Sequence, residues 1–475
     1  MLNITTDFAA TVRSVDETFL VDANFDMIKR EISANGHNAV LYYIDGFIKG
    51  GELQKLLMFL VGLDDLGDSQ QGAATRFAMV HLPDVEVDIT TNGDDIVRSV
   101  LGGCCCMISD GFNGEAIVID LRSYPSRDTQ DAENDRVMRG ARDGFVETLI
   151  FNTALIRRRI RDTRLTMKYV CVGKKSKTDI VVSYIEGEAD PKFVTRLISQ
   201  LESIDTDALP LGHQSLTEAL CRRQWYNPFP KVRLTERPDA TAAHLLEGGV
   251  AVLCDTSPEV MLLPTSVFDF LQETNDFYFP PFTGSYLRIV RMLVFASTGF
   301  ITPLWYLLIT HSAYLPSWLD FILPNELGAL PVIVQLFLTE FALDVLKLAS
   351  LTTPSTMSNS LSIIGGLLLG DFAIETGWLI PEVIFYMAFT AISNFTQSNY
   401  ELGYAFKYFR LMLLALTAFF GVWGFCAGLL LIVVLLVTMR GVCGWSYLYP
   451  LIPWNGKALG RLFLRKKKKK KEKES

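Results

Sequence analysis

Charged side chains lie inside apolar segments in the last third of the sequence. Glu340, Asp344 and Lys347 all fall in the apolar segment from Pro331 to Leu351. Each residue of a helix turns about 100°, so these three side chains lie within about 60° of one helical face. A charge at the centre of a bilayer is costly, so we expect this face to point into a bundle of helices or toward water.

The apolar segments that follow repeat the pattern. Asp371 and Glu375 are one helical turn apart, and Glu382 begins a polar stripe that continues to Asn394. Polar faces from several helices could together line an ion pathway. The candidate pathway residues are Glu340, Asp344, Lys347, Asp371, Glu375, Glu382 and Asn394.

Two interpretations of these charges stay open. In one, Lys347 neutralises Glu340 or Asp344 at neighbouring turns and these charges hold the helices together, or they lie at the ends of the segments, where charges cost little. In the other, they line a pathway, which would favour monovalent cations because acids outnumber lysine there. One chain supplies few polar faces, so such a pore would form on the axis of a ring of copies.

Long apolar segments must position these charges. A membrane-spanning helix needs about 20 mainly apolar residues. The stretch from Met292 to Thr310 meets this requirement without a charge, and the stretch from Leu411 to Met439 is longer than one span requires. The second stretch could form a kinked hairpin near Gly421, or one span with an external tail.

The distribution of Lys and Arg predicts how the segments are oriented. Arg288 and Arg291 precede the first apolar segment, which places its start inside. Lys347 marks a return inward, and Lys407 and Arg410 are expected to lie inside again. This pattern predicts four spans before the last apolar stretch.

The first part of the chain carries a repeated strand and helix pattern. Asn38 to Gly46 and Thr178 to Gly187 each form an apolar run that ends in an acid and a glycine, and an amphipathic helix pattern follows. Downstream, VLGGCCCMISD and LEGGVAVLCD each precede a second apolar run. We interpret the segments as two copies of an α/β unit with a β-hairpin in each, although chance similarity of β-rich segments is an alternative.

A connecting helix is predicted between the two copies, within Asp143 to Asp162. The arginines that crowd its C-terminal turns are Arg157, Arg158, Arg159 and Arg161. Positive charge suits the C-terminal end of a helix dipole, so these side chains could simply form a solvated helix end. They could instead form an assembly surface that contacts anionic lipid heads or an acidic neighbouring subunit.

These patterns predict an α/β cytoplasmic region of two similar subdomains followed by an all-α, multi-spanning membrane domain. The first 20 residues lack a secretory signal, because acids interrupt them, so the α/β region is expected to stay in the cytoplasm. The predicted boundaries are residues 1–135 for the first subdomain, 136–165 for the connecting helix, 166–282 for the second subdomain, 283–455 for the membrane domain and 456–475 for a basic tail.

Several classes of function find no support in the sequence. It contains no P-loop, GxSxG or HExxH motif, and its eight cysteines include no CxxC pair. We therefore expect no enzyme activity, no cofactor and no metal site. The net charge of −8 gives no reason to expect nucleic acid as a partner.

Several long motifs resemble the A subunits of bacterial spore germinant receptors, the GerA family. They are RGARDGFVETLIFNTALIRRRIRD from Arg139, NPFPKVRLTERPD from Asn227, HLLEGGVAVLCDTSPEVMLLPTSVFDF from His244, LPVIVQLFLTEFALDVLK from Leu330, and SNY from Ser398. The resemblance covers nearly the whole chain. Within the family, RSYPSR, GKKSKTD, WYNPFP and DTSPEVMLLPT are most similar to a relative encoded among dipicolinate-channel genes. The lysine tail and the run Cys104 to Cys106 depart from the family without touching these motifs.

The resemblance implies a role in spore germination, with no catalytic or cofactor-binding residue. It implies residence in the spore inner membrane with the N-terminal region on the cytoplasmic side, contact with membrane lipids and other germination membrane proteins, and assembly as a homo-oligomer, for which a pentamer is one option. It also implies passage of monovalent cations. The alternative is a non-conducting scaffold or accessory subunit that couples germinant receptors to the dipicolinate channel.

Overall fold

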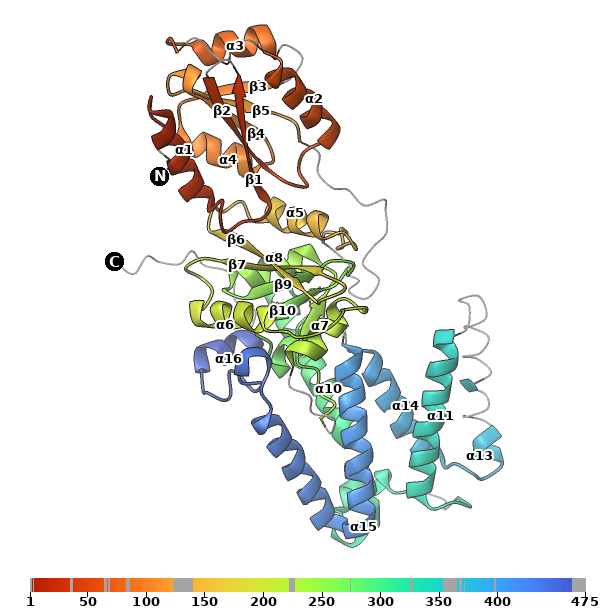
Figure 1. The fold of residues 1–475 in the computed structure, drawn as a ribbon. Coiled ribbons are helices and arrows are strands. Elements are labelled where there is room, and N and C mark those ends of the chain that lie inside the picture. Colours follow the sequence, from red (N-terminus) through yellow and green to blue (C-terminus); the bar gives the residue numbers. More distant parts are fainter. Residues whose placement is uncertain are drawn as a thin grey trace. The chain divides into compact units, whose positions relative to one another are not determined.

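The computed structural model divides the chain into two compact units (Figure 1). Unit 1 comprises Met1–Arg223, Val232–Thr265 and Gly441–Trp445, and unit 2 comprises Gln224–Lys231, Ser266–Arg440 and Ser446–Ser475. The structure describes the chain except residues 1, 3, 35–36, 64–65, 67–68, 83–85, 123–139, 222–226, 274, 325–327, 353–364, 367–369, 371, 397–398 and 464–475.

Unit 1 begins with a five-stranded antiparallel sheet of order β1-β2-β4-β5-β3. Its strands are β1 (Met27–Ala34), β2 (His37–Ile44), β3 (Val87–Thr90), β4 (Cys105–Ser109) and β5 (Ala116–Ile119). Its helices are α1 (Phe8–Phe19), α2 (Gly50–Val61), α3 (Ala73–His81) and α4 (Gly93–Leu101), with a 3₁₀ turn at Asp110–Phe112.

A second sheet in unit 1 has the equivalent order, β6-β7-β9-β10-β8. Its strands are β6 (Leu165–Val172), β7 (Thr178–Ile185), β8 (Arg233–Thr235), β9 (Val250–Cys254) and β10 (Val260–Leu263). Its helices are α5 (Leu149–Arg159), α6 (Pro191–Glu202), α7 (His213–Leu220) and α8 (Pro238–Leu246). The repeated sequence segments therefore correspond to two sheets of one topology, with hairpins β4–β5 and β9–β10.

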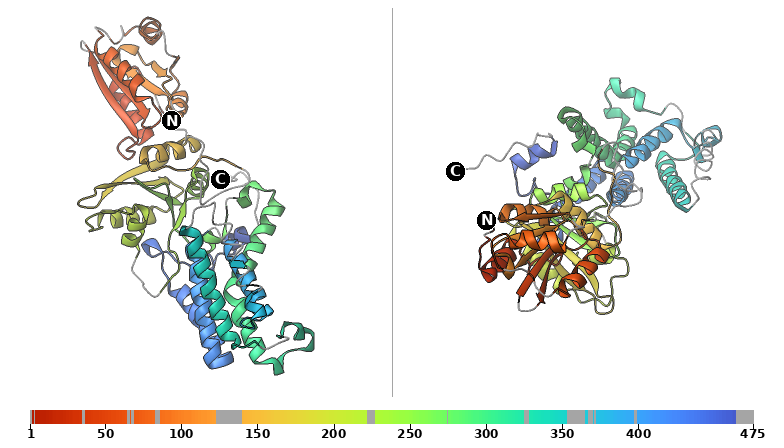
Figure 2. Two further views of the ribbon diagram at one scale, coloured as in Figure 1. Left: turned by 90° about the vertical axis from the view of Figure 1, so that its right-hand side faces the viewer. Right: turned by 90° about the horizontal axis from the view of Figure 1, so that it is seen from above.

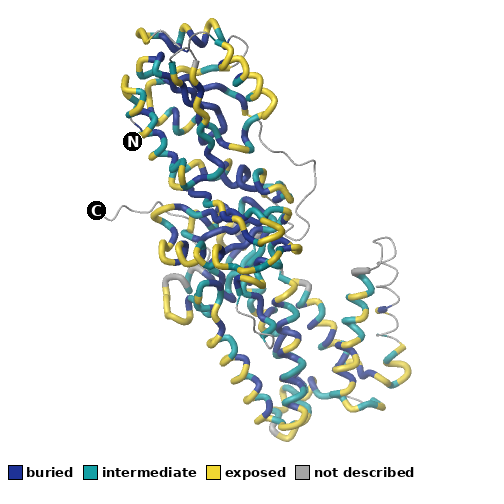
Figure 3. Tube along the Cα trace, viewed as in Figure 1, coloured by how far each residue is buried: buried dark blue, intermediate teal, exposed yellow. Residues whose placement is uncertain are grey.

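Each sheet lies between two layers of helices (Figure 1; Figure 2). Alternate residues of a strand point to opposite faces, and in β2 Leu41 joins the core under α2 and α3 while Tyr42 joins the core under α1 and α4. In the second sheet, α6 and α7 cover one face, and α5 and α8 cover the other. Burial on both faces explains the nearly continuous apolar runs of β2 and β7, which are dark blue in Figure 3.

Unit 2 consists of helices. They are α9 (Asn275–Tyr278), α10 (Pro281–Thr310), α11 (Val332–Thr352), α13 (Ala373–Glu375), α14 (Pro381–Phe395), α15 (Tyr400–Thr438) and α16 (Gly456–Phe463), and 3₁₀ turns lie at Val267–Leu271, Ser312–Tyr314 and Ser317–Ile322. Among the described residues, α10 and α15 are long and apolar enough to cross a membrane, with mean hydropathies of 1.7 and 2.7. The larger number of spans expected from the sequence stays a prediction.

Helix α15 is bent sharply at Gly421. The backbone there has φ of 58° and ψ of −134°, a conformation that glycine adopts far more readily than other residues. The two arms of α15 run back from this point (Figure 1), and a Cβ atom at Gly428 would lie 2.5 Å from Leu413 on the other arm. Of the alternatives for this stretch, the structure therefore has the kinked hairpin.

Candidate functional site

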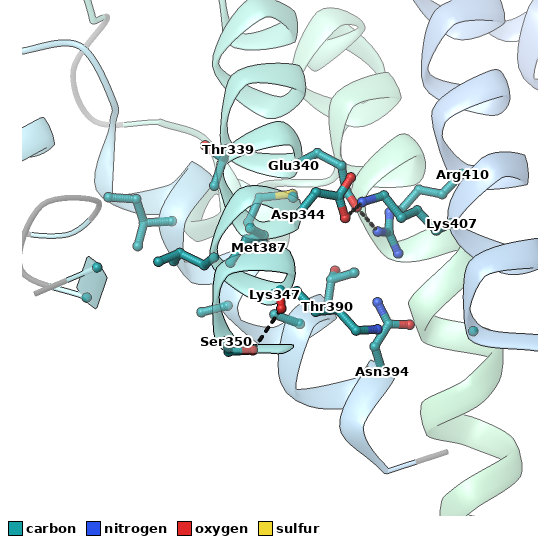
Figure 4. A pocket seen from close by; sticks show the side chains of 18 of the residues that line it. Thr339, Glu340, Asp344, Lys347, Ser350, Met387, Thr390, Asn394, Lys407 and Arg410 are labelled. Carbon is teal, nitrogen blue, oxygen red and sulfur yellow. Dashed lines mark hydrogen bonds and ion pairs between the residues drawn. The ribbon is translucent and has the colours of Figure 1, made fainter. Parts of the chain in front are cut away.

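A cavity of about 410 Å³ lies among helices α11, α14 and α15 of unit 2 (Figure 4). Helix α11 brings Glu340, Asp344 and Lys347 to it because these residues share one face. The polar and charged residues around it are Thr339, Glu340, Asp344, Lys347, Ser350, Thr390, Asn394, Tyr400, Tyr404, Lys407 and Arg410. Helix surfaces that pack against each other are usually apolar, whereas this cavity is lined by many polar and charged side chains.

Glu340 is paired with cations from α15. Its Oε1 atom accepts a hydrogen bond from Nη2 of Arg410 at 2.6 Å and lies 3.2 Å from Nζ of Lys407. The side chains of Glu340 and Arg410 are only 6% and 1% exposed. Lys407 also forms an ion pair with Asp344. Both carboxylates of α11 are thus neutralised by α15.

The same arginine reaches a third helix. Nη1 of Arg410 donates to the backbone carbonyl of Thr298 in α10 at 2.7 Å. Burying charges costs several kcal/mol per ion, and excellent geometry is needed to offset that cost. The network therefore joins α10, α11 and α15. Loss of Glu340 or Arg410 would leave a buried charge without its main partner.

Lys347 has a different environment. Its Nζ atom lies 4.3 Å from the ring centroid of Tyr404 and 5.4 Å from that of Tyr400, both within reach of cation–π attraction. Within the described part of the chain, no carboxylate lies at ion-pair distance from this ammonium group. The interpretation in which Lys347 neutralises Glu340 or Asp344 is therefore wrong, because Lys407 and Arg410 occupy both carboxylates.

The cavity collects four of the seven predicted pathway residues, namely Glu340, Asp344, Lys347 and Asn394. Glu375 is exposed on α13, and Glu382 is partly buried on α14, and neither lines the cavity. Asp371 lies outside the described residues. The prediction that all seven share a pathway is therefore unsupported for Glu375 and Glu382 and untested for Asp371.

Sequence reasoning missed Lys407 and Arg410 as members of this site. It used them only as a marker of the inner side, whereas they line the cavity from within α15 and are 8% and 1% exposed. A signal was present, because YAFKYFRLML sets both cations three residues apart in a continuous apolar pattern. That spacing places two cations on one helical face.

Three polar atoms of the cavity lining have no hydrogen-bond partner among the described residues. They are Oε2 of Glu340, Oδ1 of Asn394 and Nε of Arg410, all buried. A buried polar group without a partner costs about 1–3 kcal/mol. The cavity is large enough for several waters or a small solute, which would satisfy these atoms.

The balance of charge in the cavity differs from the expected one. Lys347, Lys407 and Arg410 face only two carboxylates, Glu340 and Asp344. The described cluster therefore carries one excess positive charge. The acid excess on which the sequence-based preference for cations rested is not present in this cavity.

The arginines of α5 do not form one exposed surface. Arg157 is buried, and it donates to Oδ2 of Asp26 at 2.7 Å through Nε and to Oδ1 at 2.9 Å through Nη2. The prediction that Arg157 belongs to an assembly surface is wrong, because its side chain is buried in an ion pair with Asp26 of the first subdomain. Arg159 pairs with Asp143 at 2.6 Å. Only Arg158 and Arg161 are exposed, so an assembly role for them stays a prediction.

The three consecutive cysteines are buried in the first sheet. Burial raises the pKa of the Cys106 thiol to about 12 and also raises the pKa of Cys104. A neutral buried thiol is a poor nucleophile and a poor metal ligand. In the described part of the chain, no group of three or more His, Cys, Asp or Glu residues could hold a metal ion.

Comparison with known proteins gives this site a family context. The family model for the Bacillus/Clostridium GerA spore germination protein matches residues 16–475. Stage V sporulation protein AF of Bacillus subtilis is 37% identical over 443 residues, which are 93% of this chain and 89% of that protein. Spore germination protein KA of Bacillus subtilis is 27% identical over 92% of this chain and 81% of that protein.

A solved structure is also similar to part of this chain. It is the crystal structure of the N-terminal domain of the A subunit of the Bacillus megaterium spore germinant receptor GerK3, with 24% identity and a TM-score of 0.42. The match covers 55% of this chain and 95% of that chain. Together with the sequence relatives, the family match confirms the resemblance inferred from the long sequence motifs.

Proposed function

Because the chain belongs to the Bacillus/Clostridium GerA spore germination protein family, we propose that it is a membrane subunit of the germination machinery that conducts monovalent cations. Its relatives are named for sporulation and spore germination, so a role in germination follows from membership. In this proposal the chain resides in the spore inner membrane with unit 1 on the cytoplasmic side. It assembles as a homo-oligomer, with a pentamer as one option, and it contacts lipids and other germination membrane proteins.

The observation that supports conduction is the charged cavity among α11, α14 and α15. Five charged side chains meet there inside helices whose remaining surface is mostly apolar. Charged groups within membrane segments are rare, and they commonly mark ion or substrate pathways. The unpartnered Oε2 of Glu340 is a carboxylate oxygen, the kind of ligand that suits a monovalent cation.

Neutralising a cavity carboxylate tests this proposal. A unit charge about 10 Å from a passing ion changes its energy by about 1.7 kcal/mol at an effective dielectric constant of about 20. We therefore expect Asp344→Asn to lower potassium efflux from proteoliposomes about tenfold or more. Asp344 is preferable to Glu340 for this test, because its side chain is 38% exposed and Lys407 keeps Glu340 as a partner.

Glu375→Gln is the matched control, since it removes a carboxylate of the same helical unit that does not line the cavity. We expect its efflux to equal that of the unaltered protein. Equal efflux for Asp344→Asn and Glu375→Gln would contradict a path through this cavity. No efflux from the unaltered protein, alone or with its partner proteins, would contradict conduction itself.

A second candidate is the non-conducting accessory subunit, and an exposed apolar surface on α2 and α3 favours it. Met58 and Met79 are 70% and 75% exposed, and Phe59, Val61 and Val80 are exposed as well. Much of α2 and α3 is yellow in Figure 3. In the equivalent helix α6, Ser199 and Glu202 occupy the positions of Met58 and Val61, because Leu197 and Leu201 correspond to the buried Leu56 and Leu60. The fold itself therefore does not require apolar residues there.

This equivalence supplies the variant that tests the second candidate. Met58→Ser with Val61→Glu transfers the surface of α6 to α2 and should leave the fold intact. If the chain works by coupling other proteins, we expect this variant to germinate slowly although potassium efflux in proteoliposomes is unchanged. Normal germination of spores that carry the variant would exclude a coupling role for this surface.

A further inference from the structure

We propose that a small monovalent anion, of the size of chloride or acetate, binds beside Lys347 in the cavity. The inference rests on the proposed function in one respect, since it names a regulator of the cavity through which cations are proposed to pass. It is carried by the charge and surroundings of one ammonium group. The anion is defined only by its charge and size.

Lys347 is the cation of the cavity for which the described chain provides no counter-ion. Asp344, one turn away on α11, is paired with Lys407, and Glu340 is paired with both Lys407 and Arg410. Glu340 cannot turn to Lys347 without releasing Arg410, whose side chain is 1% exposed, and Asp344 already holds Lys407. Lys347 is partly buried in a largely apolar helical unit, where a cation without a negative partner is costly, so an external anion is the ligand that fits.

The side chains around the ammonium group are suited to a small anion. The rings of Tyr404 and Tyr400 lie within cation–π distance of it, and Asn394 and Thr390 of α14 line the same cavity (Figure 4 labels the latter two). Oδ1 of Asn394 is buried and has no partner among the described residues. A rotation of this amide exchanges its oxygen for its two N–H donors, which would then face an anion held by Lys347.

The cavity has room for this ligand. Its volume of about 410 Å³ far exceeds the roughly 30 Å³ that one water occupies in the liquid. Waters alone would hydrate Lys347 but would leave the excess positive charge. One bound monovalent anion instead brings the formal charge of the five ionised side chains and the ligand to zero.

Neutrality links the anion to cation passage. An excess positive charge raises the energy of any cation that enters the cavity. A bound anion removes that excess, so it acts as a permissive regulator rather than as a transported ion. The anion also bridges α11 and α14, because Lys347 belongs to one helix and Asn394 to the other.

Binding of radioactive chloride to the full chain in detergent tests the site without any flux measurement. We expect saturable binding that acetate displaces. Lys347→Met removes the ammonium group and should weaken binding about ten- to hundredfold, the range for a lost hydrogen bond to a charged group. Lys347→Arg keeps the charge and should retain binding, and Lys192→Met removes an exposed lysine of α6 and should change nothing.

A second variant protects the test against misfolding of Lys347→Met. Asn394→Asp places a fixed carboxylate beside the ammonium group, so it should abolish chloride binding while the chain stays folded. Binding that survives both Lys347→Met and Asn394→Asp would overturn the proposal. The proposal would also be overturned if the unaltered chain bound no chloride but the Asp371→Asn variant did, because Asp371 would then be the counter-ion of Lys347.

The outcomes separate this inference from the proposed function. Saturable, Lys347-dependent binding by a protein that passes no potassium would support the anion site and refute conduction. Potassium efflux that is independent of chloride, from a protein that binds none, would refute the anion site and leave conduction in place.

Discussion

The buried ion pair between Asp26 and Arg157 makes a strong prediction about the stability of unit 1. Asp26 precedes β1 in the first subdomain, and Arg157 lies on α5 against the second sheet. Both side chains are at most 1% exposed, and two hydrogen bonds of 2.7 and 2.9 Å join them. Asp26→Asn keeps the shape of the side chain but removes its charge.

The cost of this substitution follows from what it leaves behind. The guanidinium of Arg157 would remain buried with only neutral acceptors, namely the newly introduced amide, the carbonyl of Leu165 and the side chain of Asn24, each of the last two at 3.4 Å. Removing one partner of a buried ion pair costs about 3–5 kcal/mol. Asn24 also accepts from the backbone N–H of Met167 at 2.6 Å, so the whole junction between the subdomains should loosen.

Hydrogen exchange of the full chain in detergent, followed by mass spectrometry, measures this loosening. The most protected amides of β1, β2 and β6 should exchange faster by about two to nearly four orders of magnitude, since each 1.36 kcal/mol corresponds to a factor of ten. Amides of α10 and α15, in the other unit, should keep their rates.

Asp162→Asn is the matched control, because Asp162 and Arg164 form an equally short pair of which the arginine is 54% exposed. Exposed pairs contribute at most about 1 kcal/mol, so its effect should be less than about tenfold. Asp26→Asn combined with Arg157→Met removes both charges and should recover most of the protection. Equal effects of Asp26→Asn and Asp162→Asn would refute this reasoning.

Three further predictions concern single residues. Gly421→Ala forces a Cβ atom onto a left-handed backbone at the bend of α15 and should lower the free energy of unfolding by about 1–3 kcal/mol, measured as a lower melting temperature in detergent, whereas Gly50→Ala in open space on α2 should not destabilise. Because burial raises the pKa of the Cys106 thiol to about 12, N-ethylmaleimide at pH 8 should modify the exposed Cys171 long before Cys106. The unfolded thiol titrates near pH 9, so the contribution of Cys106 to stability is complete below that pH and is lost as the pH rises toward 12; urea titrations across this range measure it.

The sequence predicted the parts of the fold that depend on local pattern. The strand and helix pairs at β2–α2 and β7–α6 were predicted because a short apolar run and the spacing of apolar residues in an amphipathic helix are both visible within a few residues of sequence. The paired Gly-Gly runs before β4 and β9 similarly indicated a repeat, and the two sheets have the same order. The bend near Gly421 was one of two alternatives, since two glycines in an apolar helix do not by themselves distinguish a kink from a continuous span.

Contacts between distant segments were not predictable in the same way. Arg157 suited the end of a helix dipole, and nothing near it in the sequence indicated a partner 131 residues away. Asp344 lies one turn and Glu340 two turns from Lys347, which made Lys347 their obvious partner. Lys407 and Arg410 instead take that role from a helix some 60 to 70 residues later. Which of several cations meets a carboxylate depends on how helices pack, and helical periodicity does not determine that.

Chemical modification inside the cavity tests most directly whether it carries ions. Thr390→Cys places a thiol in the cavity lining, and Phe385→Cys places one on the exposed face of the same helix, both in a chain with Cys426→Ser. We predict that a positively charged methanethiosulfonate reduces the potassium current of Thr390→Cys in planar bilayers and leaves that of Phe385→Cys unchanged. An unchanged current from fully modified Thr390→Cys would contradict the role of this cavity as the ion path.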